Sequence, residues 1–158
     1  MTDKFSHINK DNQPKMVNVG GKKITKRTAI AKAEMFLGKQ IISHFNDKEL
    51  VTKKGPVFQT AIIAGIQAVK KTSELIPMCH PLLINAVDIT IDIIDTENIE
   101  IQCKVEIEGK TGVEMEALTG ANITALTVYD MCKSISQKMV IKEVKLLKKT
   151  GGKSDINF

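Results

Sequence analysis

The chain has 158 residues, a length that fits one domain with a sizeable core, and 42% of its residues are apolar, which excludes a disordered protein. No apolar run reaches the ~20 residues that a membrane-spanning helix needs, and the polar residues 1–4 predict no secretory signal. Three cysteines without a Cys-x-x-Cys pair argue against a disulfide framework or structural zinc, so a cytoplasmic protein is expected.

The net charge of +5 is concentrated near the C-terminal end. Beyond residue 130, seven lysines face only two acids, Glu143 and Asp155. This excess indicates either a solvated strand and tail or attraction of a polyanion, which would be a phosphorylated metabolite or a nucleic acid. Aromatic residues make up only 4% of the chain. Because the bases of single-stranded nucleic acids usually stack on such rings, a small polyanion is the favoured partner.

The first third of the chain is predicted to contain a strand and a short helix. Residues 1–15 are polar and are expected to be flexible, and residues 16–19 are compatible with a short strand. Over residues 24–37, small residues alternate with larger, mostly polar ones, which favours a strand, although the alanines also tolerate a helix. After Gly38, residues 39–46 are predicted to be a short helix.

A long helix is predicted to begin at Pro56, because proline at the first helical position lacks only an N–H that would be free there anyway. Apolar residues then recur at i, i+3 and i+4 spacing to about residue 75. Gly65 and the alanines on this helix would let another element approach closely. Residues 76–81 are predicted to be irregular, because two prolines bracket them.

The second half of the chain is predicted to form two strands, a helix and a last strand. Apolar and polar residues alternate over residues 87–93 and 99–107, which is typical of half-buried strands joined as a hairpin. Residues 109–133 open on a glycine turn and run without a proline, so a second long helix is expected. Residues 140–147 are predicted to be a strand, and residues 148–158 a flexible polar tail.

The predicted order is strand, helix, helix, strand, strand, helix, strand, in a single domain of residues 1–158. With one extra helix, this is the order of ferredoxin-like folds. Antiparallel strands with one apolar face need a cover, and two long helices can supply it. The sequence therefore predicts an α+β, ferredoxin-like fold with a four-stranded antiparallel sheet covered by helices.

Two Gly-Lys-Ser/Thr triplets, at residues 109–111 and 152–154, imitate a phosphate-binding P-loop. That motif requires a glycine five residues before its second glycine, where this chain has Lys104 and Leu147. A P-loop ATPase is therefore disfavoured. The glycines of residues 109–112 still precede a predicted helix, whose free N–H groups and dipole can hold an anion.

Cys79 and His80 stand side by side in the proline-bracketed loop. Adjacent residues rarely ligate one metal ion together, and the chain has no second Cys/His cluster, so a metal site is disfavoured. His80 is a candidate hydrogen-bond donor or acid/base group facing a ligand. Cys79, Cys103 and Cys132 are more simply interpreted as small buried residues.

Ionisable groups stand at both ends of the predicted 109–133 helix. Glu114 and Glu116 lie near its start, where carboxylates are favourable even without a function. Asp130 and Lys133 share a helix face and form either a plain surface ion pair or, because apolar residues surround Asp130, a partly buried pair with shifted pKa values. Lys54 is equally compatible with a solvent-exposed and a functional position.

Three long motifs of the chain stand out: residues 76–82 (Ile-Pro-Met-Cys-His-Pro-Leu), 110–119 (Lys-Thr-Gly-Val-Glu-Met-Glu-Ala-Leu-Thr) and 125–133 (Ala-Leu-Thr-Val-Tyr-Asp-Met-Cys-Lys). Together with residues 7–9, 16–17, 63–66 and 151–154, they resemble one family over nearly the whole chain: the cyclic pyranopterin monophosphate synthases, or molybdenum cofactor biosynthesis protein C. Two positions depart from the pattern of the family: Pro56 stands where the family usually has an acidic or polar residue, and Gly120 stands where it usually has a small residue.

The resemblance implies a lyase of molybdenum cofactor biosynthesis. Its substrate would be (8S)-3′,8-cyclo-7,8-dihydroguanosine 5′-triphosphate, which is converted to cyclic pyranopterin monophosphate with release of pyrophosphate. The family forms a homohexamer, a trimer of dimers. Because each step moves protons, no redox cofactor is expected. Mg²⁺ assisting the loss of pyrophosphate is compatible with this chemistry, although no cluster of residues requires a metal.

Matched residue by residue, the resemblance assigns catalysis to Asp130, Lys133 and Lys54. Substrate contacts are assigned to Met78, Cys79, His80, Met115, Glu116, Glu114 and Arg27. Glu116 and Asp130 are fourteen residues apart, which is roughly 21 Å along a straight helix. Either the helix breaks near Gly120, or a symmetric dimer brings Asp130 of one chain to Glu116 of the other.

Two other classes of function compete with an enzyme. An RNA-recognition module shares the ferredoxin-like topology, but its central strand carries aromatic residues, whereas residues 99–103 carry none. A purely structural assembly protein would form an oligomer without a ligand pocket. Neither a nucleic acid nor a membrane is expected as a partner.

Overall fold

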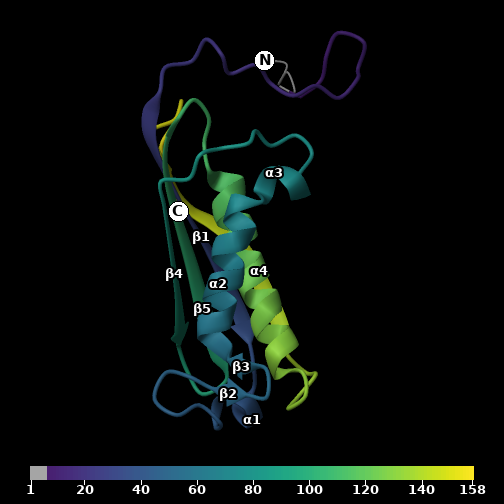
Figure 1. Ribbon diagram of the computed structural model, residues 1–158, viewed down its shortest axis with the longest axis vertical. Helices are drawn as coiled ribbons and strands as arrows, with labels where there is room; N and C mark the ends of the chain where they lie inside the picture. Colours follow the sequence, from purple (N-terminus) through teal and green to yellow (C-terminus); the bar gives the residue numbers. More distant parts are fainter. Residues whose placement is uncertain (1–6) are drawn as a thin grey trace.

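The computed structural model describes residues 7–158, in which two long helices lie side by side on one face of an antiparallel sheet (Figure 1). The sheet has the strand order β4-β5-β1-β6-β7, and β2 and β3 form a separate hairpin. Among these residues, none of the helices has the length and apolar character needed to cross a membrane. The strands are β1 (Thr25–Phe36), β2 (Val51–Thr52), β3 (Gly55–Pro56), β4 (Ala86–Ile93), β5 (Asn98–Gly109), β6 (Val140–Thr150) and β7 (Ile156–Asn157), and the helices are α1 (Lys39–Ile42), α2 (Val57–Lys70), α3 (Thr72–Leu75) and α4 (Glu114–Cys132).

The two-residue alternation of the sequence accounts for the central strands. β1 turns fully buried alanines toward the helices, while Lys32 and Glu34 point to the open face of the sheet. Small side chains on this central strand leave room for α4 to pack closely. The buried pairs across β1 and β5 include Ala29 with Val105, Ala31 with Cys103, and Ala33 with Ile101.

Gly65 of α2 and Gly120 of α4 form the crossing point of the two helices. A Cβ atom on Gly65 would overlap the Thr124 hydroxyl and lie 2.7 Å from Ile89 Cδ1, and one on Gly120 would lie 2.6 Å from Cys103 Sγ. The prediction that Gly65 allows close approach is confirmed. Gly120 does not interrupt α4, which is continuous over its 19 residues.

Replacing Gly65 by alanine is expected to destabilise the protein by about 1–3 kcal/mol, because the new methyl group must displace packed atoms of α4 and β4. Chemical denaturation of the purified variant measures this. The control is Gly21→Ala, where a Cβ atom meets nothing within 4 Å. Equal unfolding midpoints for the two variants would show that the helices are not packed as tightly as described.

Several predicted elements differ from those of the structure, beginning near the N-terminal end. Residues 16–19 form no strand, because the Val17 carbonyl accepts a hydrogen bond from His80 Nε2 (2.8 Å) instead of a backbone partner. The short helix after Gly38 ends at Ile42 rather than at residue 46. Of the predicted flexible segment 1–15, residues 1–6 lie outside the described part, and residues 7–15 contain turns and a bridge between Ile8 and Pro14.

The second helix also differs from its prediction at both ends. Pro56 is extended (φ −69°, ψ 128°) and pairs with β2, so the helix begins one residue later, at Val57. It ends at Lys70 rather than at residue 75. The Thr72 hydroxyl donates to the carbonyls of Ala68 (3.1 Å) and Val69 (3.0 Å), which competes with continuation of the helix.

The predicted combination of an antiparallel sheet with covering helices is confirmed, but the sheet has five strands rather than four. The predicted tail contains the end of β6 and all of β7, whose Ile156 pairs with Lys149. Gly151 makes this turn with φ 81°, which favours glycine, and its N–H donates to Asp155 Oδ1 (2.9 Å).

Candidate functional site

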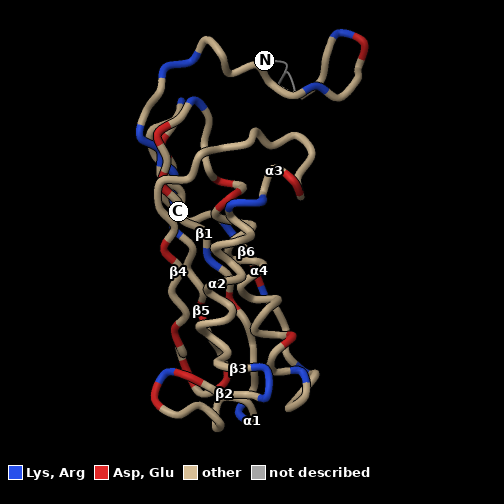
Figure 2. Tube along the Cα trace, viewed as in Figure 1, with Lys and Arg blue, Asp and Glu red and all other residues tan. Residues whose placement is uncertain are grey.

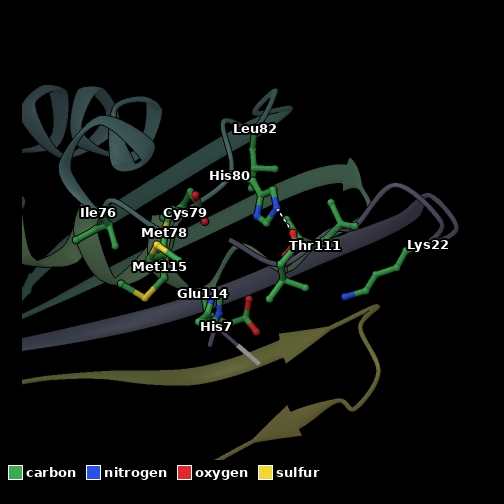
Figure 3. A pocket seen from close by; sticks show the side chains of 14 residues that line it. His7, Lys22, Ile76, Met78, Cys79, His80, Leu82, Thr111, Glu114 and Met115 are labelled. Carbon is green, nitrogen blue, oxygen red and sulfur yellow. Dashed lines mark hydrogen bonds between the residues drawn. The ribbon is translucent and has the colours of Figure 1, made fainter. Parts of the chain in front are cut away.

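A cavity of about 580 Å³ opens where the N-terminal end of α4 meets the proline-bracketed loop (Figure 3). The loop follows α3, and a hydrogen bond from the Cys79 N–H to the Ile76 carbonyl (3.0 Å) fixes its turn. Residues before β1 form another part of the wall. The cavity is lined by His7, Val17, Val19, Lys22, Ile76, Met78, Cys79, His80, Leu82, Thr111, Gly112, Glu114, Met115 and Glu116.

His80 connects this loop to the segment before β1. Its Nε2 lies 2.8 Å from the Val17 carbonyl oxygen. Because a carbonyl only accepts hydrogen bonds, Nε2 carries the proton, and in the neutral ring Nδ1 is then an acceptor. Lys110, which follows β5, also bonds to the segment before β1, since its Nζ donates to the Gly20 carbonyl (2.6 Å).

Two carboxylates from the first turn of α4 face the cavity. Glu114 accepts a hydrogen bond from Lys149 Nζ of β6 (2.9 Å), and its carboxylate folds so closely over Gly112 that a Cβ atom there would overlap it. Glu116 is only 4% exposed. Burial, together with the nearby charge of Glu114, raises the pKa of Glu116 to about 6. Glu116 is thus a buried acceptor that titrates just below neutral pH.

A second cavity of about 140 Å³ lies beside the first and is rich in cationic groups. Arg27 is almost fully buried, and its Nε donates to the Gly109 carbonyl (3.0 Å), which holds the guanidinium against the turn before α4. Lys22, Thr111, Gly112 and Glu114 line both cavities. The other basic residues of the second cavity are Lys149 and Lys153.

Lys54, Asp130 and Lys133 come together at the opposite end of α4, where the turn between β2 and β3 meets the last turn of the helix. Figure 2 shows basic and acidic positions close together at this end of α4. Lys54 Nζ lies 2.5 Å from Asp130 Oδ2, and Lys133 Nζ lies 2.8 Å from Oδ1. The Asp130 side chain is 53% exposed, so of the two interpretations offered by the sequence the surface ion pair is the one observed, and the partly buried pair is wrong. Its two lysine partners, Lys133 first, nevertheless lower the pKa of Asp130 to about 2, and Asp130 raises the pKa of Lys133.

The structure thus separates the predicted site residues. Met78, Cys79, His80, Met115, Glu116 and Glu114 share the first cavity, and Arg27 lies in the second. Asp130, Lys133 and Lys54 form a cluster that lines neither cavity. Because α4 runs unbroken through Gly120, the explanation that the helix breaks there is wrong for this chain.

Sequence reasoning missed three basic residues of the cavities, Lys22, Lys149 and Lys153. No motif of the sequence singles out Lys22, and Lys149 and Lys153 fall in the segment predicted to be a flexible polar tail. The charge excess beyond residue 130, which favours a small polyanion, includes Lys149 and Lys153 but not Lys22. The predicted burial of the cysteines holds for Cys103 and Cys132, whereas Cys79 is half-buried in the cavity wall.

A cavity with two carboxylates, one of them buried, next to a smaller cavity lined by cations is the arrangement expected of an enzyme that binds a small anionic molecule. The sequence model described as "MoaC family" matches residues 16–152, and the chain belongs to this family.

Relatives are found in bacteria and a eukaryote. The chain is 51% identical to "Molybdenum cofactor biosynthesis protein 1" of Dictyostelium discoideum, over 96% of this chain and 27% of that protein. It is 48% identical to the "Molybdenum cofactor biosynthesis bifunctional protein" of Synechocystis, over 97% and 45%. It is 49% identical to the "Cyclic pyranopterin monophosphate synthase" of Helicobacter pylori strain HPAG1, over 95% and 94%. The chain thus spans less than half of the first two proteins but nearly all of the third.

Proposed function

We propose that this chain is a cyclic pyranopterin monophosphate synthase, a phosphorus–oxygen lyase of molybdenum cofactor biosynthesis. It converts (8S)-3′,8-cyclo-7,8-dihydroguanosine 5′-triphosphate to cyclic pyranopterin monophosphate and releases pyrophosphate. The observation that carries this proposal is the match over 94% of the Helicobacter pylori protein of that name. The paired cavities support it, since one offers carboxylates and the other offers cations.

The two cavities suit the two parts of such a substrate. The triphosphate lies against Arg27, Lys22 and Lys149, whose charges neutralise it. The guanine-derived ring lies in the larger cavity, where Glu116 accepts its N–H donors. Met78 and Met115 supply apolar contact with the ring.

The lysine–aspartate cluster supplies proton transfer. At neutral pH Asp130 is ionised and Lys133 is protonated, because their pKa values are shifted in opposite directions. Lys133 therefore begins as a proton donor and as a counter-charge for phosphate oxygens, and Asp130 holds both lysines in place. Ring opening, pterin formation and closure of the cyclic phosphate all move protons, which this cluster can give and take back.

The active site is shared between two chains of a dimer, three of which make a homohexamer. Asp130 lies roughly 21 Å along an unbroken helix from Glu116, too far for one substrate to contact both in one chain. A two-fold axis brings the lysine–aspartate cluster of one chain to the cavity of the other. Exposed apolar side chains on the outer sides of α2 and α4, including Ile63 and Leu126, support such an interface.

Three finer points belong to the same proposal. The four long strands, in the order β4-β5-β1-β6 with α2 and α4 on one face, form a ferredoxin-like unit to which β7 is added. The enzyme acts in the cytoplasm. Mg²⁺ accompanies the triphosphate or pyrophosphate, without a protein-built metal site.

The decisive test is turnover of enzymatically generated cyclic dihydro-GTP by the purified protein, followed by mass spectrometry of the product. Formation of cyclic pyranopterin monophosphate and pyrophosphate is expected. Tight, strongly salt-dependent RNA binding without any effect of GTP-like ligands would instead favour the RNA-recognition alternative.

Binding of GTP, as a stable guanine triphosphate, is expected to weaken about tenfold as the pH falls from 7 to 5. The pKa of Glu116 is raised to about 6, so its carboxylate is largely ionised at pH 7 and largely neutral at pH 5, and only the ionised form accepts two N–H donors. Calorimetric titration measures the affinity. Glu116→Gln is the control, because protonation of the ligand's phosphates affects both proteins alike. Parallel pH profiles for the two proteins would remove Glu116 from the binding role.

A further inference from the structure

One carboxylate outside the predicted site, that of Glu49, accepts three backbone hydrogen bonds. Its Oε1 accepts from the N–H groups of Leu50 (2.9 Å) and Phe58 (2.9 Å), and its Oε2 accepts from that of Gln59 (3.1 Å). The backbone of Glu49 is itself held, since its N–H and carbonyl both bond to Asn46. All of these contacts are to main-chain groups, so the Glu49 side chain fixes the path of the backbone around it.

Glu49 supplies the cap that α2 otherwise lacks. Pro56, the residue before the helix, makes no side-chain capping bond. The first N–H groups of a helix have no partner inside the helix, and Glu49 accepts two of them, from Phe58 and Gln59. Its negative charge also lies at the positive end of the helix dipole. The same carboxylate therefore ties the entrance of the β2–β3 hairpin to the first turn of α2.

The hairpin closed in this way carries Lys54 at its tip. The Lys54 N–H donates to Thr52 Oγ1 (3.1 Å), and that hydroxyl donates to the Gly55 carbonyl (3.3 Å). From this turn, Lys54 Nζ reaches both the Oδ2 (2.5 Å) and the backbone carbonyl (3.1 Å) of Asp130. Both ends of the hairpin are thus anchored by Glu49 while its tip meets α4.

We propose that Glu49 is a positioning residue for Lys54: it locks the β2–β3 hairpin onto α2 and thereby holds the Lys54 amine against Asp130. The consequence for turnover rests on the proposed function, in which Lys54 acts in catalysis. The placement of the Lys54 amine does not depend on that function and is measurable by itself.

The first test measures the amine directly. Lysines are labelled with a trace of acetic anhydride, and the rate at each position is read by peptide mass spectrometry. In Glu49→Gln, the side-chain amide turns an N–H₂ toward one of the three backbone donors and removes the charge. Lys54 should then react several-fold faster and approach its rate in Asp130→Asn. Lys142, which pairs with Glu34 on the open face of the sheet, is the internal reference and should not change.

Two further variants keep this test decisive. Asp95→Asn is a matched control, because Asp95 also accepts backbone bonds, from Glu97 (2.7 Å) and Asn98 (2.8 Å), but in the β4–β5 hairpin. It should leave Lys54 labelling unchanged. If Glu49→Gln does not fold, Glu49→Asp, which keeps the charge on a shorter side chain, replaces it. A wild-type labelling rate at Lys54 in the folded variant overturns the proposal.

The second test is a double-mutant cycle on turnover. Glu49→Gln alone should lower kcat about tenfold with little change in KM, since a displaced catalytic group affects the chemical step. In a Lys54→Ala background the same change should have no further effect. An equal loss in both backgrounds would mean that Glu49 only stabilises the fold and would overturn the proposal. Full activity of Lys54→Ala would instead contradict the catalytic assignment of Lys54, and the labelling rates would still decide the role of Glu49.

Discussion

Replacing Asp130 by asparagine is expected to lower turnover by ~10²-fold or more, the usual scale for loss of an acid/base group. The change removes the charge that holds Lys54 and Lys133 within 2.5 and 2.8 Å of one carboxylate. Lys54→Ala and Lys133→Ala are expected to have effects of the same size, because each removes a charged partner from the cluster. Steady-state rates with enzymatically generated substrate measure all three.

Folding should be nearly unchanged in these variants. Their side chains are about half exposed, and ion pairs between such side chains contribute little to stability. Lys142→Ala is the matched control, because it breaks the ion pair with Glu34 on the open face of the sheet (2.9 Å) and should keep wild-type turnover. If two of the three cluster variants retain near wild-type turnover, the catalytic assignment is wrong.

Regular elements with a strong local signal could be predicted from the sequence. The alternation of apolar and polar residues located β1, β4 and β5 within a few residues, because side chains of a strand point to opposite faces. The long stretch free of proline located α4. These patterns are local, so neighbouring residues alone determine them.

Boundaries set by distant partners could not be predicted. The Val17 carbonyl bonds to a histidine 63 positions away, and Ile156 pairs with β6 only after the turn at Gly151. Neither contact produces a periodic pattern of apolar residues in the sequence around Val17 or Ile156. The end of α2 coincides with hydrogen bonds that the Thr72 hydroxyl donates to the carbonyls of Ala68 and Val69, and helix propensity does not predict such bonds.

The functional site also combines residues that one local motif predicts with contacts between distant parts of the chain that the sequence does not predict. Met78, Cys79 and His80 are consecutive, so their common cavity followed from one motif. The contact between Lys54 and Asp130 spans 76 positions, and the resemblance named both residues without showing that they touch. Glu49 carried no signal, because its partners are backbone N–H groups, which every residue type except proline offers.

Mixing two inactive variants is expected to restore activity if the site is shared between chains. Asp130→Asn lacks a working lysine–aspartate cluster but has an intact cavity, and Glu116→Gln has the reverse defect. In a mixed dimer, one site combines both defects and the other combines the two intact halves. With random exchange of equal amounts, half of the dimers are mixed and half of their sites work, which gives about a quarter of wild-type activity.

The control mixture pairs Asp130→Asn with Lys133→Ala. Both defects lie in the cluster that Lys54, Asp130 and Lys133 form within one chain, so no arrangement of these subunits assembles an intact cluster. This mixture should stay inactive. Exchange is verified by mass spectrometry of differently tagged subunits. If exchange is complete and the Asp130→Asn and Glu116→Gln mixture remains inactive, one chain must hold the whole site, and α4 would have to bend during catalysis to bring its two ends to one substrate.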